Sequence, residues 1–192
     1  MTVPVLLLAA GASRRLGRPK QLVRLGGESL LRRAARAALA GGGPALVVLG
    51  ARAEAMRAEL AGLPVTVVVN PDWREGMAAS IRAGLRALPE GAGAVLFLAC
   101  DQPAVDGQLV NRLLELHGRH PDAVVACAYA GARGIPALFP ARCFPALLAL
   151  TGDRGARGLL AGADVVELPF PEGAMDVDQE EDLPGQGLSA NR

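Results

Sequence analysis

The sequence has little lysine, histidine or cysteine, and these shortages exclude several kinds of site. Lys20 is the one lysine among 20 basic residues, and there are only two histidines, neither in a pattern that indicates catalysis. The three cysteines form no CxxC pair, so their spacing argues against a zinc site and predicts reduced thiols in the cytosol. They are Cys100, Cys127 and Cys143.

Long apolar runs and a strong net charge are also missing. No apolar run reaches the roughly 18 residues that a membrane helix needs. The short apolar stretch near the start follows no basic residue and leads directly into a loop, so we interpret it as a buried strand rather than a signal peptide. The net charge of +1 argues against a general nucleic-acid binder. We therefore expect a cytoplasmic protein that binds neither membranes nor nucleic acid.

The charges that are present are unevenly placed. Residues 1–60 contain ten basic and three acidic side chains, whereas residues 151–192 contain three basic and nine acidic ones. This division could bring a cationic anion-binding loop and an acidic metal-binding segment to one cleft, although solvated surface charge is the alternative for most of these residues. Lysine is a compact point charge, whereas arginine is a wide planar fork. A narrow pocket that places one ammonium beside phosphate oxygens would therefore accept Lys20 and resist arginine.

Apolar segments alternate with helical patterns along the chain. Apolar and β-branched runs predict strands over residues 3–8, 45–49, 65–69, 94–99, 123–128 and 164–168, and a short strand near an edge over 137–139. Helices are predicted over 29–40, 53–60, 77–88 and 107–118, with short ones over 144–150 and 156–160. The alternation predicts an α/β fold with a mostly parallel central sheet and helices on both faces. We expect one domain over residues 1–183 and a loose tail over 184–192.

Ligands in such folds bind beyond the carboxyl ends of the strands, which selects the segments 9–20, 70–80 and 100–103. The first reads Gly11-x-Ser13-x-Arg15-x-Gly17-x-Pro19-Lys20. This spacing fits neither GxGxxG nor GxxxxGK[ST], so the ordinary dinucleotide and P-loop motifs are excluded. Its glycines and the charges of Arg15 and Lys20 still predict a phosphate cradle, with a solvated surface loop as the alternative.

Acidic residues follow the strand over 94–99 and gather again near residue 178. Asp101 is the second residue after that strand, where a half-buried carboxylate needs a partner. Mg²⁺, held by one or two carboxylates and substrate phosphates, would be a suitable partner. Asp176 and Asp178 share one face of an extended segment and could complete the site. The alternatives are an ordinary turn for Asp101 and a helix N-cap for Asp178.

The remaining candidate segment, residues 70–80, contains the only tryptophan, Trp73. Its ring could recognise a base or another ring. The alternative is that it caps the hydrophobic core, which is the commoner place for an isolated tryptophan.

The candidate segments above and several further motifs form a series of sequence blocks over residues 5–183. They read LAAGASRRLGRPKQL over 8–22, Asn70-x-x-Trp73-x-x-Gly76-Met77-x-x-Ser80, Cys100-Asp101-Gln102-Pro103, Gly134-Ile135-Pro136, Leu150-Thr151-Gly152-Asp153-Arg154-Gly155-Ala156-Arg157, and Asp176-Val177-Asp178. In this order the blocks resemble the molybdenum cofactor cytidylyltransferase family of nucleotidyltransferases. The loop with AAG and PK is similar to the cytidylyl branch, since the guanylyl branch usually has AGG and DK.

The resemblance implies a Rossmann-like nucleotidyltransferase fold and the transfer of CMP from CTP to the terminal phosphate of molybdopterin, with release of pyrophosphate. It implies that Lys20 and Arg15 act on phosphate oxygens, that Asp101 is catalytic, and that Asp101 and Asp178 bind Mg²⁺. A molybdoenzyme or its chaperone would receive the product. The implied nucleotide-binding residues are Leu8, Ala9, Ala10, Gly11, Ser13, Lys20, Asn70, Gly76 and Ser80.

Two departures from the family pattern bear on these roles. Ile135 stands where the family often has histidine, which affects the assignment of the acceptor. Gln179 and Glu180 stand where the family often has Thr-Pro, which affects the metal role of Asp178.

Three alternatives stay open at this stage. A nucleotidyltransferase of the same fold could use another nucleotide or acceptor, as in guanylyl transfer to molybdopterin or transfer to a sugar phosphate or an alcohol. A nicotinamide oxidoreductase is disfavoured by the missing GxGxxG and by the lack of an acidic residue at the ribose distance. A non-catalytic carrier would bind molybdopterin without releasing pyrophosphate.

Overall fold

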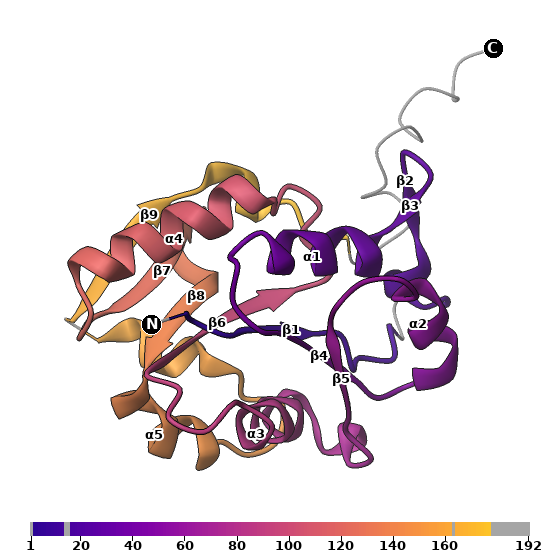
Figure 1. Ribbon diagram of the computed structural model, residues 1–192, viewed down its shortest axis with the longest axis horizontal. Helices are drawn as coiled ribbons and strands as arrows, with labels where there is room; N and C mark the ends of the chain where they lie inside the picture. Colours follow the sequence, from indigo (N-terminus) through magenta and orange to yellow (C-terminus); the bar gives the residue numbers. More distant parts are fainter. Residues whose placement is uncertain (1, 14–15, 163, 178–192) are drawn as a thin grey trace.

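The central element of the structure is a seven-stranded sheet with the order β5-β4-β1-β6-β8-β7-β9 (Figure 1). The computed structural model describes residues 2–13, 16–162 and 164–177. The strands of this sheet are β1 (Val5–Leu8), β4 (Ala45–Leu49), β5 (Thr66–Val69), β6 (Ala94–Ala99), β7 (Val124–Tyr129), β8 (Ala132–Pro140) and β9 (Val165–Pro169). A separate hairpin consists of β2 (Arg24–Leu25) and β3 (Glu28–Ser29).

Helices occupy most of the connections between the strands. The α-helices are α1 (Leu30–Leu39), α2 (Ala53–Glu59), α3 (Met77–Arg86), α4 (Gly107–Arg119) and α5 (Phe144–Leu148). Short 3-10 helices are η1 (Lys20–Leu22), η2 (Trp73–Glu75), η3 (Ala141–Cys143), η4 (Ala156–Ala161) and η5 (Pro171–Ala174). Short polar side chains fix two of the starts: the Ser29 hydroxyl accepts from the Arg32 N–H at 3.3 Å, and Asp106 accepts from the Leu109 N–H at 2.9 Å.

The sheet is buried on both faces because alternate side chains of each central strand enter two separate apolar cores. In β1, Val5 and Leu7 belong to the core that α1, α2 and α4 cover. Leu6 and Leu8 belong to the core that α3 and α5 cover. Figure 1 shows α1 and α4 on one side of the sheet and α3 and α5 on the other. Because both faces of β1 are buried in this way, its sequence is a continuous apolar run. The predicted α/β class with a mostly parallel sheet covered on both faces is confirmed.

The predicted short strand over 137–139 near an edge is wrong in both length and place. The strand β8 spans nine residues, lies between β6 and β7, and is antiparallel to both. Its register against β7 shifts where Ala126 pairs with Ala137 and Cys127 pairs with Gly134, so Ile135 and Pro136 form a bulge. Glycine and proline are rare inside central strands, and they concealed the first half of β8 in the sequence.

Smaller differences concern element ends and the hairpin of β2 and β3. The other predicted strands and helices are present, with ends that differ by one or two residues from the prediction. The hairpin was not predicted, because its strands have two residues each and lack the length of an apolar pattern. Its turn residues, Gly26 and Gly27, both have positive φ angles.

The strand order places the expected ligand-binding loops along one edge of the sheet. Leu8 at the end of β1 pairs with Val48 of β4 on one side and with Ala99 of β6 on the other. The loops that follow β1 and β6 therefore emerge next to each other. Asn70 follows β5 at the same edge, and its N–H donates to the carbonyl of Leu49 at the end of β4. This edge is where an open α/β sheet binds its ligands.

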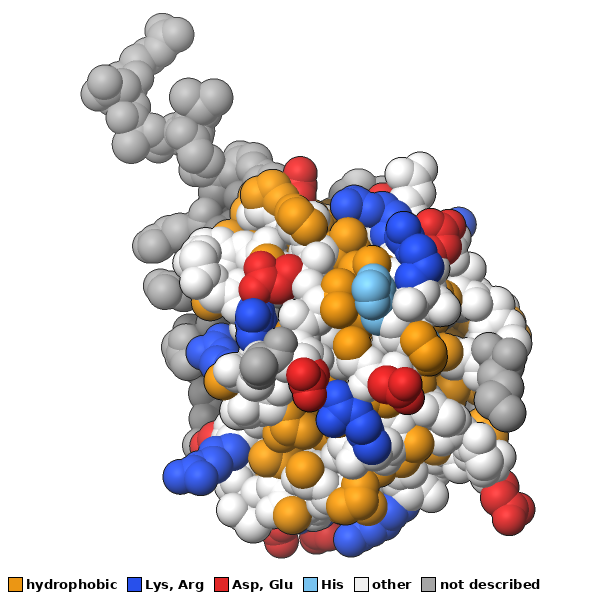
Figure 2. Space-filling view, turned by 90° about the vertical axis from the view of Figure 1, so that its left-hand side faces the viewer, with side chains coloured by type: hydrophobic (Ala, Val, Ile, Leu, Met, Phe, Trp, Pro, Cys, Tyr) orange, Lys and Arg blue, Asp and Glu red, His pale blue; other side chains and the backbone are white. Residues whose placement is uncertain are grey.

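The helices in the described part of the chain are short, and α4 is one of the longer ones with 13 residues. None of the helices there is both long enough and apolar enough to cross a bilayer. The face shown in Figure 2 mixes acidic and basic side chains with small groups of apolar ones.

The glycines of α3 and α4 allow a test of how closely the helices approach the sheet. A Cβ atom at Gly84 of α3 would collide with the side chain of Leu6 in β1, whereas one at Gly118 of α4 would meet no atom within 4 Å. We expect Gly84→Ala to lower the free energy of unfolding by about 1–3 kcal/mol through overpacking. Gly118→Ala should leave it unchanged or raise it by up to about 1 kcal/mol. Urea denaturation measures both, and equal effects of the two substitutions would contradict the packing described.

Candidate active site

An ion pair between two residues far apart in sequence lies at the ligand-binding edge of the sheet. The Lys20 ammonium donates to a carboxylate oxygen of Asp101 at 2.5 Å, although 81 residues separate them. Lys20 begins η1 in the loop after β1, and Asp101 follows β6, the neighbour of β1. The side chains are 18% and 21% exposed, so both groups are shielded by protein and still reachable from solvent.

The loop after β1 holds Lys20 in place through a buried amide. Gln21, which is 1% exposed, donates from its amide nitrogen to the carbonyls of Ala9 at 3.0 Å and Gly11 at 2.7 Å. The Ser13 hydroxyl donates to the Gln21 amide oxygen at 3.2 Å and accepts from the Lys20 N–H at 2.9 Å. Ser13 has a positive φ of 51°. These bonds fold the loop back onto its own start, so the Lys20 side chain leaves the chain at a defined point.

The acidic segment near residue 176 lies beside Asp101. The Val177 N–H donates to the Asp101 carbonyl at 2.9 Å. Val177 is 1% exposed and packs in a small apolar cluster with Leu16, Val23 and Leu30. The sequence-predicted neighbourhood of Asp101 and Asp176 therefore exists at the backbone level. Two further predicted residues, Arg15 and Asp178, lie outside the residues that the structure describes.

The groups around the ion pair show what this site can and cannot do chemically. Within the described ranges, no group of three or more His, Cys, Asp or Glu side chains could hold a metal ion by itself. Mg²⁺ needs only one or two carboxylates when substrate phosphates supply the other ligands, and the half-buried Asp101 carboxylate is suited to be one of them. Burial raises the pKa of the Cys100 thiol to about 12, with the Asp101 charge adding to the effect. Cys100 is therefore a neutral thiol, unsuited to covalent catalysis.

The residues predicted to bind the nucleotide after β1 form the floor of this edge. Leu8, Ala9 and Ala10 are buried, and Ala10 accepts a hydrogen bond from the Ala51 N–H at 3.1 Å through its carbonyl. Gly11 is exposed, and a Cβ there would meet no atom within 4 Å. The lack of a side chain at Gly11 leaves the backbone open there. The contact of these residues with a nucleotide remains a prediction.

Asn70, Gly76 and Ser80, the other predicted nucleotide-binding residues, also have structural contacts. Asn70 and Ser80 are both buried, and the Asn70 amide donates to the Ser80 hydroxyl at 3.2 Å. The Asn70 side-chain oxygen accepts from the Asp72 N–H at 3.0 Å, which fixes the turn after β5. Gly76 has a φ of 105°, and a Cβ on it would collide with Gly152 and Asp153. These contacts join the 70–80 segment to the loop around Gly152.

Trp73 packs against the core that α3 covers and is only partly buried. The Arg74 guanidinium lies 4.5 Å from the centre of its ring. A Cβ on Gly50 would come within 2.8 Å of both the Trp73 ring and the Ala10 carbonyl, so the tryptophan lies directly on the loop after β4. This packing agrees with the core-capping interpretation.

Sequence reasoning missed three polar residues that organise the site: Gln21, Gln102 and Tyr129. Gln102, which is 5% exposed, donates from its amide nitrogen to the Tyr129 hydroxyl at 3.3 Å and to the carbonyls of Ile135 at 3.1 Å and Gly173 at 3.2 Å. Its amide oxygen is buried and has no hydrogen-bond partner among the described residues. A glutamine next to Lys20 and another next to Asp101 were the available signal, but the sequence does not show which backbone carbonyls their amides bond.

Comparison with known proteins agrees with this arrangement. Residues 5–168 match the MobA-like NTP transferase domain family. The chain is 36% identical over 191 residues to nicotine blue oxidoreductase of Paenarthrobacter nicotinovorans, covering 92% of each chain. The crystal structure of Rv0371c from Mycobacterium tuberculosis superposes with a TM-score of 0.82 at 32% identity, covering 95% of each chain. A structure of the same protein described as a complex with manganese gives 0.78 at 29% identity, covering 95% of this chain and 96% of that one.

The match covers the sheet, the loop that holds Lys20 and the strand end that holds Asp101. Because the family match extends over most of the chain and includes both of these segments, the chain belongs to the MobA-like NTP transferase family and is a nucleotidyltransferase.

Proposed function

We propose that this protein transfers CMP from CTP to the terminal phosphate of molybdopterin and releases pyrophosphate. The observation that carries the proposal is the meeting of the Lys20 ammonium and the Asp101 carboxylate at 2.5 Å on the ligand-binding edge. One cation for phosphate oxygens and one carboxylate for a divalent ion are the charges that a nucleoside triphosphate with Mg²⁺ needs. Each group already has the other as a partner, so a nucleotide with its metal would insert between them.

The transfer would be an in-line displacement at the α-phosphorus of CTP. A phosphate oxygen of the acceptor forms the new P–O bond, and the bond from the α-phosphorus to pyrophosphate breaks. The acceptor phosphate is already ionised at neutral pH, so no strong general base is needed, and neither histidine is required. Lys20 would hold the triphosphate and stabilise the charge that develops on it. Arg15, which belongs to the same loop, is proposed to assist Lys20.

A divalent ion is proposed to bind at Asp101, with Asp178 as a second ligand. Bound there, Mg²⁺ would neutralise charge on the triphosphate and the leaving pyrophosphate. The relative described as a complex with manganese supports the use of a divalent ion. The protein's own contribution is to fix the Asp101 carboxylate at the end of β6 and to bring the chain around residue 177 beside it.

The choice of CTP rests on the residues of the loop after β1. Ala10 and Pro19 stand where the guanylyl branch of the resembled family usually has glycine and aspartate. Leu8, Ala9, Ala10, Gly11 and Ser13 from this loop, with Asn70, Gly76 and Ser80 from the neighbouring segment, are proposed to surround the base and ribose. Guanylyl transfer to molybdopterin, or transfer to a sugar phosphate, would use the same edge, and a non-catalytic molybdopterin carrier would use it without releasing pyrophosphate.

An oxidoreductase is a second candidate because of the name of one relative. The protein with 36% identity is called nicotine blue oxidoreductase. The loop after β1 lacks the GxGxxG spacing of a dinucleotide-binding turn, which disfavours a nicotinamide cofactor in the usual position. An absorbance change of NADH or NADPH on incubation with the protein and a dye acceptor would favour this second function.

Substitutions at the ion pair test the proposed roles of Lys20 and Asp101. We expect Lys20→Ala and Asp101→Asn each to lower turnover by about 10²–10³-fold, because a preorganised charge contact is lost. Lys20→Arg should restore little activity, because the wide guanidinium does not fit a pocket for one ammonium. Pyrophosphate release measures the rate, and a thermal melt confirms folding.

The matched control for these substitutions is Arg24→Ala. Arg24 is an exposed cation on β2 whose ion-pair partner, at 2.9 Å, is Glu59 of α2. Its loss should leave turnover within about twofold. Turnover near that of the unmodified protein in Lys20→Ala or Asp101→Asn would remove the altered residue from the mechanism.

Nucleotide selectivity can be measured without the acceptor. We expect CTP with Mg²⁺ to stabilise the folded protein by about 2.7 kcal/mol at a hundredfold excess over its dissociation constant. ATP, GTP and UTP should stabilise it less, and Asp101→Asn should abolish the part that depends on Mg²⁺. A differential scanning assay with all four nucleotides gives this comparison. A larger response to GTP would contradict the cytidylyl assignment, and a response to none would contradict the nucleotide site itself.

A further inference from the structure

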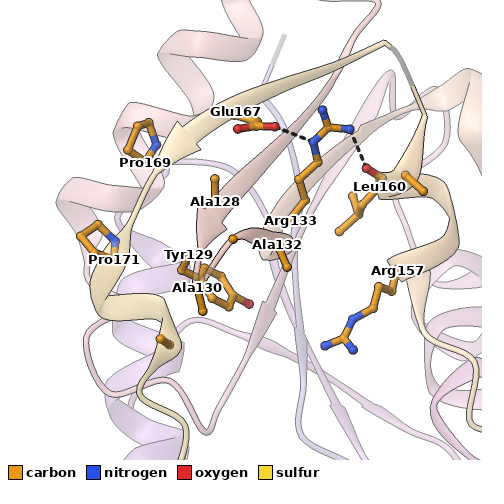
Figure 3. A pocket seen from close by; sticks show the side chains of 13 residues that line it. Ala128, Tyr129, Ala130, Ala132, Arg133, Arg157, Leu160, Glu167, Pro169 and Pro171 are labelled. Atoms are coloured by element: carbon orange, nitrogen blue, oxygen red, sulfur yellow. Dashed lines mark hydrogen bonds and ion pairs between the residues drawn. The ribbon is translucent and has the colours of Figure 1, made fainter.

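An open groove of about 1100 Å³ lies beyond the ends of β7 and β9, beside the ion-pair site. Its walls come from the turn between β7 and β8, from η4 and from the segment around η5 (Figure 3). Alanine and proline form just over half of the lining: Ala128, Ala130, Ala132, Ala161, Pro169, Pro171 and Ala174. The groove is large enough for an organic ligand of the size of a cofactor.

Contacts of Gln102 and of the 173–177 segment join the groove to the ion-pair site. Gln102 follows Asp101 directly and donates to the hydroxyl of Tyr129, which lines the groove. The segment that bonds Gln102 through the Gly173 carbonyl also bonds the Asp101 carbonyl through the Val177 N–H. The groove and the ion-pair site are therefore joined by one residue, Gln102, and by one segment, 173–177.

Tyr129 is fixed in one position by its surroundings. Its hydroxyl donates to the Ile135 carbonyl, in the bulge of β8, at 2.8 Å. A Cβ at Gly134 would collide with the Tyr129 hydroxyl, and one at Gly173 would lie 2.7 Å from its ring, so glycines on both sides leave room for the aromatic side chain. Burial raises the pKa of Tyr129, so the hydroxyl stays neutral at ordinary pH. The groove thus has a rigid floor with a polar edge.

The two arginines of the groove differ in their contacts. Arg133 is fully engaged: it pairs with Glu167 at 2.7 Å and donates to the carbonyls of Leu160 at 3.0 Å and Gly162 at 2.8 Å. Arg157 makes no hydrogen bond or ion pair with any residue that the structure describes, and Figure 3 shows its guanidinium extending into the groove. Since Glu167 is neutralised by Arg133, Arg157 supplies the one uncompensated charge among the residues that line the groove.

We propose that this groove binds the organic body of the acceptor substrate and that Arg157 binds a carbonyl or anionic oxygen on it. The inference rests on the proposed function, in which the acceptor's phosphate must reach the ion-pair site. Apolar walls of alanine and proline suit a flat heterocycle, and a guanidinium fork suits its polar edge. Arg157 is then a specificity-determining residue of the acceptor and makes no contact with the nucleotide.

Separate Michaelis constants for the acceptor and the nucleotide test this assignment. Arg157→Ala should raise the KM for molybdopterin by about ten- to a hundredfold, the usual range for a lost hydrogen bond to a charged group, and leave the KM for CTP within twofold. The control is Arg154→Ala, which removes an exposed arginine three residues earlier in the same segment that does not line the groove. It should change neither constant.

A second variant obstructs the groove without removing a charge. Ala132 is exposed at the start of β8 and lines the groove, so Ala132→Trp should fold and should raise the acceptor KM by a similar factor. A thermal melt of each variant checks the fold. If both variants leave the acceptor KM within twofold of the unmodified protein, the groove does not bind the acceptor, whatever the nucleotide.

The proposed function and the groove fail in different ways in this experiment. A protein that releases pyrophosphate with glucose 1-phosphate or another phosphorylated acceptor, and not with molybdopterin, contradicts the proposed function. The two variants are then compared on that acceptor, and a selective rise in its KM still supports the groove. A rise in the nucleotide KM together with the acceptor KM would overturn the assignment of Arg157 to the acceptor.

Discussion

The contact between Lys20 and Asp101 depends on the pairing of β1 with β6 in the middle of the sheet. Parallel neighbours end at the same edge, so the segment after each strand starts within reach of the other. The loop after β1 must then fold back for Lys20 to meet Asp101, and the buried amide of Gln21 holds it there through the carbonyls of Ala9 and Gly11. Opposite charges at this one point are the pair of charges that the proposed polyphosphate–cation site requires.

The end of β6 also connects the two halves of the molecule. Three successive residues follow the strand with different tasks: Cys100 is a buried neutral thiol, Asp101 faces Lys20, and Gln102 bonds the β7–β8 region. The bulge of β8 matters here, because it frees the Ile135 carbonyl from the ladder for Gln102 and Tyr129. A strand that looks irregular in the sequence thus supports the wall of the neighbouring groove.

Local patterns in the sequence predicted the fold class and most elements, because the strands of a doubly covered sheet are continuous apolar runs. The rule that ligands bind at strand ends was enough to select Lys20 and Asp101 as neighbours. The first half of β8 escaped prediction, since Gly134 and Pro136 are typical of loops. Gln21, Gln102 and Tyr129 escaped it because their partners are backbone carbonyls, which no residue type reveals. The groove that Arg157 lines could not be predicted, because its walls come from segments that are far apart in the sequence.

A crystal structure with a non-hydrolysable CTP analogue and Mn²⁺ tests the proposed shared role of Lys20 and Asp101 most directly. An anomalous peak of manganese should lie within coordination distance of the Asp101 carboxylate, about 2.0–2.3 Å. The Lys20 ammonium should have left that carboxylate for an oxygen of the triphosphate. A nucleotide bound at another part of the surface, or an ion pair that stays closed beside a bound nucleotide, would contradict the account.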